Sequence, residues 1–144
     1  MSRPADPKAN TGALRREGSP VNLPPTLALR CGPVTAVDLA LFAAASGDHN
    51  PLHLDADTAR RAGFERPVVH GMFTMANAAR LFTQNFGAGR LLSLQTRFTG
   101  VALLGDTLLF EATLIDPGNG HYGLSVRTET GTVLVSGSAR VAVS

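Results

Sequence analysis

The sequence has one cysteine, no tryptophan and no apolar run long enough to cross a membrane. Because Cys31 has no partner, the chain cannot form an intrachain disulfide, and a reducing compartment is favoured. A membrane-spanning helix needs about 18 or more consecutive apolar residues, and a signal peptide needs an apolar middle region. Neither pattern is present, so we expect a cytoplasmic protein with no membrane partner.

The sequence also lacks a surplus of charge outside its N-terminal region. It has 13 basic and 11 acidic residues, and four of the basic and two of the acidic residues lie before Leu23. The rest of the chain therefore carries nine charges of each sign. A neutral body with few aromatic residues does not offer the basic surface that nucleic acids require. We expect no nucleic-acid partner.

The composition divides the chain near residue 25. Residues 1–25 are rich in Pro, Gly, Ser, Asn and charged residues and have few large apolar side chains, which predicts a flexible N-terminal extension. Residues 26–144 have the length of one domain. A chain of this size buries roughly two thirds of the surface that it exposes when unfolded, which is enough for a hydrophobic core.

The first part of the domain shows one strand and two helical patterns. An alternating run predicts a strand at residues 26–30. A capping pattern followed by helical apolar spacing predicts a helix over residues 35–46. Asp55 or Asp57 can then cap a brief helix that ends at Gly63.

A longer helical segment and four alternating runs follow. Residues 71–86 have apolar side chains on most sides, which predicts a helix enclosed by other elements. Period-two alternation predicts strands at residues 92–98, 108–114, 122–128 and 133–143. Their short, turn-rich connections favour antiparallel neighbours. The pattern predicts an α+β fold in which a curved antiparallel sheet wraps around a central apolar helix.

The most informative segment lies between the helical patterns, where residues 46–53 read S-G-D-H-N-P-L-H. It places the Asp48 carboxylate and the His53 imidazole five positions apart, and Pro51 prevents a continuous helix between them. Further on, a His70-Gly71 pair opens the apolar helix, whose first backbone N–H groups have no partner within the helix. An acid, a base and free N–H donors are suited to chemistry beside a carbonyl group.

Several motifs carry a resemblance to a known family: F-A-A-A-S-G-D-H-N-P-L-H-L-D from Phe42, A-R-R-A-G-F from Ala59, H-G-M-F-T-M from His70 and R-F-T-G-V-A-L-L-G-D-T-L from Arg97. Together they closely resemble the MaoC-like hydratases and dehydratases of fatty acid metabolism, including the (R)-specific enoyl-CoA hydratases. One departure is Val101, near which the family usually has a proline.

The resemblance implies the hot-dog fold for residues 26–144, usually as a homodimer or higher homo-oligomer. It also implies an acyl-CoA or acyl-carrier-protein thioester as substrate, bound at the subunit interface. The implied reaction is the reversible addition of water to a trans-2-enoyl thioester, which gives an (R)-3-hydroxyacyl thioester. No organic cofactor is expected, because CoA or the carrier protein is part of the substrate.

The reaction requires a base, an acid and stabilisation of an enolate oxygen. Asp48 and His53 are the candidate catalytic pair, because an imidazole can accept a proton near neutral pH and the carboxylate can hold the same water. Which of them transfers which proton stays open. Gly71 is the candidate oxyanion donor, because its N–H lies at the positive end of the helix dipole and it has no Cβ. The candidate supporting residues are Ser46, Gly47, Asn50 and His70.

Other interpretations remain open. Asp48 and His53 could instead be a turn-capping carboxylate and a structural histidine, and Asn50 could only shape the turn. We expect no metal, because Pro51 prevents His49 and His53 from sharing a helix face. An acyl-CoA thioesterase is an alternative, although residues 71–86 contain no carboxylate. A further alternative is an acyl-binding subunit of a heteromeric dehydratase.

Overall fold

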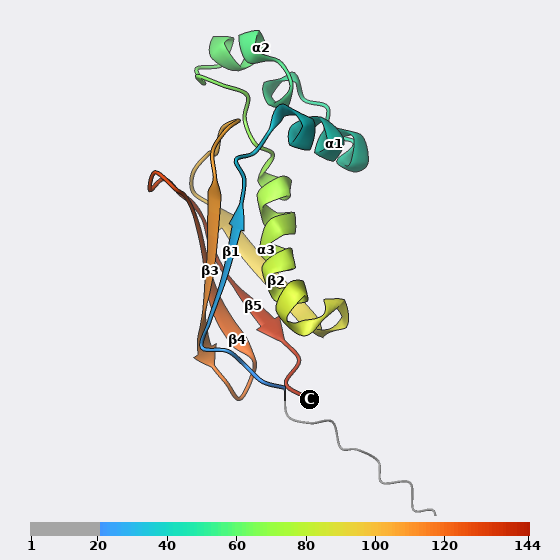
Figure 1. The fold of residues 1–144 in the computed structure, drawn as a ribbon, viewed down its shortest axis with the longest axis vertical. Coiled ribbons are helices and arrows are strands. Elements are labelled where there is room, and N and C mark those ends of the chain that lie inside the picture. Colours follow the sequence, from blue (N-terminus) through green and yellow to red (C-terminus); the bar gives the residue numbers. More distant parts are fainter. Residues whose placement is uncertain (1–20) are drawn as a thin grey trace, which may run out of the picture.

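A computed structural model describes residues 21–144. Its centre is a single five-stranded sheet in which all neighbouring strands are antiparallel, as Figure 1 shows. The spatial order is β1 (Thr26–Cys31), β3 (Leu108–Asp116), β4 (His121–Thr128), β5 (Val133–Val141) and β2 (Leu91–Phe98). The predicted flexible extension at residues 1–25 falls, for residues 1–20, outside the described part.

The helices lie on one side of the sheet and at one of its ends (Figure 1). The long helix α3 (Gly71–Phe86) runs along one face of the sheet. The helices α1 (Ala36–Ser46) and α2 (Ala56–Arg61) gather beyond the N-terminal end of α3. Two short 3₁₀ helices, η1 (Pro51–His53) and η2 (Ala88–Arg90), complete the fold. The predicted α+β architecture is confirmed.

Local sequence signals begin and end the helices where they were predicted to do so. The Thr35 hydroxyl accepts a hydrogen bond from the N–H of Asp38, and the Asp38 carboxylate accepts one from the N–H of Thr35. Gly47 ends α1 in the left-handed conformation, with φ of 76°. The N-cap of α2 is Asp55, whose carboxylate accepts a hydrogen bond from the N–H of Thr58.

The core lies between α3 and the sheet. The buried face of α3 carries Ala78, Leu81 and Phe82, and the Phe82 ring meets the ring of Tyr122 edge-on at a centroid distance of 5.7 Å. Burying each large apolar side chain contributes about 1.5–3 kcal/mol. The packing therefore fixes α3, and with it the position of its N-terminus, relative to the sheet.

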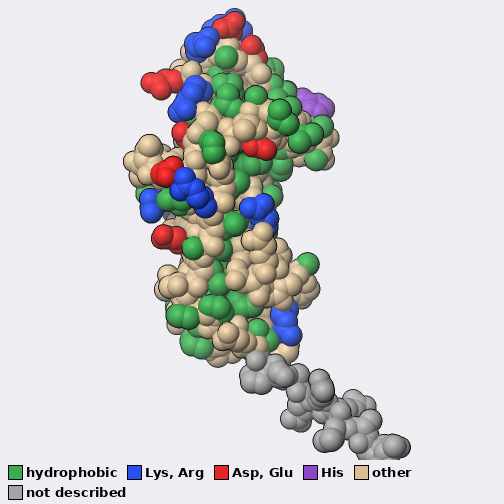
Figure 2. All heavy atoms as spheres, in the orientation of Figure 1, with side chains coloured by type: hydrophobic (Ala, Val, Ile, Leu, Met, Phe, Trp, Pro, Cys, Tyr) green, Lys and Arg blue, Asp and Glu red, His purple; other side chains and the backbone are tan. Residues whose placement is uncertain are grey.

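The sheet covers only one face of α3 in the described chain. Met72, on the opposite face near the N-terminus of the helix, is 58% exposed. The helix is therefore not enclosed on all sides within one chain. Along the edge strand β2, which pairs only with β5, Leu92 at a bulge and Phe98 at the end of the strand are also exposed. Figure 2 shows hydrophobic side chains at the surface of the face that it draws.

No helix within residues 21–144 has the length and apolar character needed to span a bilayer.

Candidate active site

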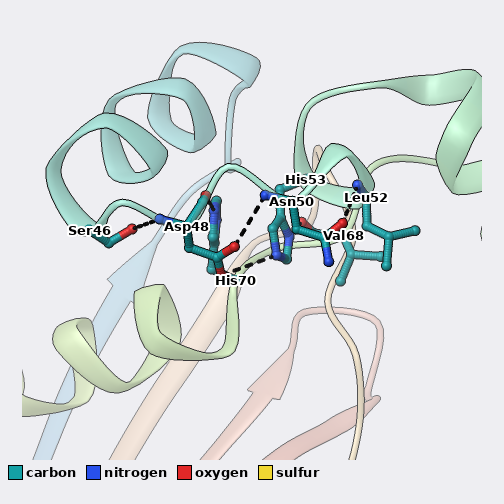
Figure 3. A network of polar contacts seen from close by, with 7 residues as sticks. All are labelled: Ser46, Asp48, Asn50, Leu52, His53, Val68 and His70. Atoms are coloured by element: carbon teal, nitrogen blue, oxygen red, sulfur yellow. Dashed lines mark hydrogen bonds and ion pairs between the residues drawn. The ribbon is translucent and has the colours of Figure 1, made fainter.

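The segment between α1 and α2 folds back over the N-terminus of α3 and is shaped by its own polar side chains (Figure 3). Ser46 Oγ accepts a hydrogen bond from the N–H of Asp48 at 3.2 Å, and Asp48 Oδ1 accepts one from the N–H of Asn50 at 3.2 Å. Asn50 Oδ1 in turn accepts from the N–H of Leu52 at 3.0 Å. Each bond closes a two-residue turn of the kind that short polar side chains favour. Ser46 and Asn50 thus hold the loop through backbone contacts.

The loop brings Asp48 and His53 together. Asp48 Oδ2 lies 3.6 Å from His53 Nε2, with the histidine side chain largely buried and the carboxylate half-exposed. His53 Nδ1 lies 2.6 Å from the backbone carbonyl of Val68. Because a carbonyl oxygen can only accept, Nδ1 carries the hydrogen in this contact. In this tautomer the lone pair of Nε2 lies beside the carboxylate, where it can accept a proton from a water molecule held between the two groups, as a general base requires.

His70 lies beneath this pair and is only 1% exposed. Its ring stacks on the ring of His53 at a centroid distance of 3.7 Å and makes an edge-to-face contact with the ring of Phe42 at a centroid distance of 4.9 Å. His70 Nε2 lies 3.1 Å from the backbone carbonyl of Asp48. Burial lowers the pKa of His70, because desolvation penalises the charged imidazolium.

Gly71 begins α3 and faces a cavity. Its N–H has no hydrogen-bond acceptor among residues 21–144, as expected for the first residue of a helix. The cavity has a volume of about 210 Å³ and mostly apolar walls. It is lined by His53, Val68, Val69, Gly71, Thr74, Phe98, Gly100, Val101, Ala102, Leu134 and Val135. A free N–H donor and the His53 ring thus border one apolar space.

The structure brings all the candidate residues into one region and adds others that the sequence did not indicate. The carbonyl of Val68 determines the His53 tautomer. The sequence could not indicate this contact, because every residue has a backbone carbonyl. Phe98 ends β2, and its ring lies 3.3 Å from where a Cβ on Gly71 would stand. Thr74, one turn after Gly71, is buried and lines the cavity. The sequence could have indicated it, because it is one of the few polar residues in the apolar helix.

Donor atoms of Asp48, His53 and His70 all lie within 4.8 Å of one another, a spacing that a metal ion could use. One ring nitrogen of each histidine is bonded to a backbone carbonyl, at Val68 and at Asp48, and the other nitrogen is left free within the described chain. Protein zinc sites use three or four side-chain ligands, and their histidines often make such a second contact. The geometry therefore does not decide the question, and the expectation of no metal stays a prediction.

Comparison with known proteins identifies a matching family and several similar proteins. The family model described as "MaoC like domain" matches residues 19–136. Peroxisomal multifunctional enzyme type 2 of Mus musculus is 38% identical over 119 residues, which cover 80% of this chain and 16% of that protein. A probable enoyl-CoA hydratase 2 of Dictyostelium discoideum is 34% identical over 102 residues, which cover 69% of this chain and 35% of that protein.

The chain thus spans a sixth to about a third of the length of these curated relatives. Among solved structures, an (R)-hydratase from A. caviae involved in PHA biosynthesis superposes with a TM-score of 0.70 at 30% identity, covering 90% of this chain and 99% of that one. The predicted hot-dog fold and the resemblance are both confirmed. The chain belongs to the MaoC-like dehydratase family.

Proposed function

We propose that this domain adds water reversibly to a trans-2-enoyl thioester of CoA or acyl-carrier protein and forms an (R)-3-hydroxyacyl thioester. The observation that carries the proposal is the convergence of His53 Nε2 and the Asp48 carboxylate, 3.6 Å apart, beside a cavity that also reaches Gly71 at the start of α3. The relatives named as enoyl-CoA hydratase and (R)-hydratase support this class of reaction and this stereochemistry.

In the proposed reaction, a water molecule lies between Asp48 and His53. His53 Nε2 or the carboxylate accepts a proton as the water oxygen forms a bond to C3 of the substrate. The electrons of the C2–C3 double bond move toward the thioester carbonyl and give an enolate oxygen. A proton from the same pair then reaches C2 and completes the hydration. Dehydration follows the same steps in reverse.

Gly71 is assigned to the enolate oxygen. Its N–H is unpaired within the described chain, and the dipole of the 16-residue helix α3 adds partial positive charge at this end. Preorganised donors aimed at a developing oxyanion contribute about 2.7–4 kcal/mol to lowering the barrier. The apolar walls of the cavity suit the acyl chain of the substrate.

We further propose that the protein acts as a homodimer that joins two copies along β2. This strand is at the edge of the sheet, so its outer backbone groups are unpaired in the described chain. Exposed Leu92, Met72 and Phe98 lie on or beside this edge. A second copy would cover them and the open face of α3, in agreement with the expectation that the thioester binds at the subunit interface. Pairing with a different subunit would cover the same surface.

The experiment that tests the function follows the loss of the conjugated enoyl chromophore with enoyl-CoA substrates of increasing chain length. The unmodified protein should hydrate at least one of them, and chiral analysis should show the (R) product. Asp48→Asn and His53→Ala should each lower turnover by about 10²–10⁴-fold. Turnover within about threefold of the unmodified protein, under about 1 kcal/mol, would overturn the assigned roles.

The same assay separates the alternative activities. A thioesterase would release free thiol without prior loss of the chromophore, which a thiol-reactive dye detects. An acyl-binding subunit of a heteromeric dehydratase would be inactive alone and would still bind the enoyl thioester. The proposed hydratase predicts hydration by the purified chain and no thiol release.

A further inference from the structure

His70 is a buried titratable residue to which the proposed reaction assigns no step. It precedes Gly71 in the chain and is the N-cap residue of α3, yet its side chain makes no capping hydrogen bond. It contacts the acid–base loop instead, from 22 positions away in sequence. Figure 3 shows it beside Asp48 and His53, and its side chain is buried.

Three contacts hold the His70 ring. Nε2 reaches the Asp48 carbonyl, one face stacks on His53 with an interplanar angle of 20°, and the ring of Phe42 on α1 makes an edge-to-face contact with it. The remaining nitrogen, Nδ1, is buried and has no hydrogen-bond partner among the described residues. The loop, η1 and α1 thus each contact the ring.

These contacts determine the protonation state of the ring. A carbonyl oxygen can only accept a hydrogen bond, so Nε2 must carry the hydrogen and Nδ1 must be bare. Protonating Nδ1 would place a second N–H, and a charge, in a buried position without an acceptor. The titratable groups that face His70 are Asp48 on the loop and His53 on η1, and burial outweighs the stabilising effect of the Asp48 carboxylate on the charged form.

We propose that His70 is a positioning residue, held neutral with its hydrogen on Nε2, that ties the loop carrying Asp48 to the helix end that carries Gly71. The inference rests on the proposed function of this site. Because His70 and Gly71 are adjacent, one hydrogen bond fixes the separation between the acid and the oxyanion donor. The stacked face restricts the rotation of the His53 ring, whose Nδ1 already donates to the Val68 carbonyl.

The role differs from simple core packing, because it depends on both a donor and an aromatic face. His70→Phe keeps a ring that can stack on His53 and removes the donor to Asp48. His70→Gln keeps an amide donor of similar reach and removes the stacked ring. His49 is exposed in the same loop and lies outside the cluster, so His49→Gln is a matched control.

The kinetic test compares the three variants on the best enoyl-CoA substrate. Misplacing a catalytic group by about 1 Å costs about 10²-fold in rate. We expect His70→Phe to lower kcat by about this factor with KM changed less than about threefold, and His70→Gln to recover at least a tenth of the kcat of the unmodified protein. A His70→Phe variant that folds and keeps kcat within about threefold would overturn the proposal.

Nitrogen-15 NMR of the imidazole rings tests the same proposal in the unmodified protein, without need of a folded variant. The His70 signals, assigned through their bonded connections to the His70 backbone, should show the Nε2–H tautomer and a titration midpoint below that of the urea-unfolded chain. An Nδ1–H tautomer, or a midpoint at or above the unfolded value, would overturn the proposal. If the protein hydrates no enoyl thioester, the proposed function fails, whereas the NMR result still decides whether His70 anchors the loop.

Discussion

Replacing Gly71 by alanine should lower turnover and leave the stability of the fold nearly unchanged, so it tests the proposed oxyanion site by itself. The backbone of Gly71 does not have a positive φ, so alanine can adopt it without strain. The added Cβ would stand 3.3 Å from Cε1 and 3.5 Å from Cζ of Phe98. That ring is half-exposed and can move by a few tenths of an ångström. Alanine also has a helix propensity up to about 1 kcal/mol better than glycine, so the free energy of unfolding should change by less than about 1 kcal/mol.

The effect on catalysis should be much larger. The Cα–Cβ bond of a helical residue tilts toward the N-terminus, which is also the direction of the free N–H of Gly71. The methyl group would therefore fill the space through which a thioester oxygen reaches this donor. Losing one oxyanion donor costs about 2.7–4 kcal/mol, so kcat should fall by about 10²–10³-fold.

The assay measures enoyl chromophore loss for Gly71→Ala, with urea unfolding of the same samples. Gly89→Ala is the matched control, because Gly89 has no positive φ and no atom within 4 Å of its added Cβ. A double variant with Phe98→Ala tests whether the displaced ring causes the loss, in which case activity returns. Turnover of Gly71→Ala within about threefold of the unmodified protein would refute the assignment of this N–H to the oxyanion.

Three further predictions concern stability and assembly. Thr35→Ala removes one half of the capping box and should lower the free energy of unfolding by about 1 kcal/mol in urea titrations, with hydratase turnover unchanged. The pKa of His70 is lowered in the folded protein, so His70 takes up a proton in the unfolded chain first as the pH falls below about 6.5. The free energy of unfolding should therefore fall below that pH, and it should fall less steeply in His70→Phe. Leu92→Lys on the exposed edge strand should lower the sedimenting mass of a β2-paired dimer, whereas Ile115→Lys on β3 should not.

Local signals made much of the fold predictable. The capping box at Thr35, the glycine that ends α1 and the alternation in the four later runs depend on residues close in sequence, so they can be read from the chain. The apolar helix at residues 71–86 and the motif from Ser46 to His53 are of the same kind. The resemblance to the MaoC-like family, carried by that motif and by His70-Gly71, is confirmed by the family match.

The order of the strands could not be read in the same way. β2 is the first strand after α3 in sequence, yet it pairs only with the last strand, β5, and forms the sheet edge. The apolar pattern of residues 92–98 does not indicate an edge, because alternation records which side chains share a face and not which strand lies beside them. The exposure of Leu92 on this edge strand and the open face of α3 were likewise found only in the tertiary structure.

By itself, the sequence determined which groups are available for the chemistry: a carboxylate and an imidazole on either side of Pro51 in the chain, and a glycine that opens a helix. Only the tertiary structure decided how they act together, because the deciding contacts join positions distant in the chain. The Val68 carbonyl sets the tautomer of His53, and His70 reaches back 22 residues to the Asp48 carbonyl. Backbone carbonyls are the same at every position, so only the fold selects which of them a side chain meets.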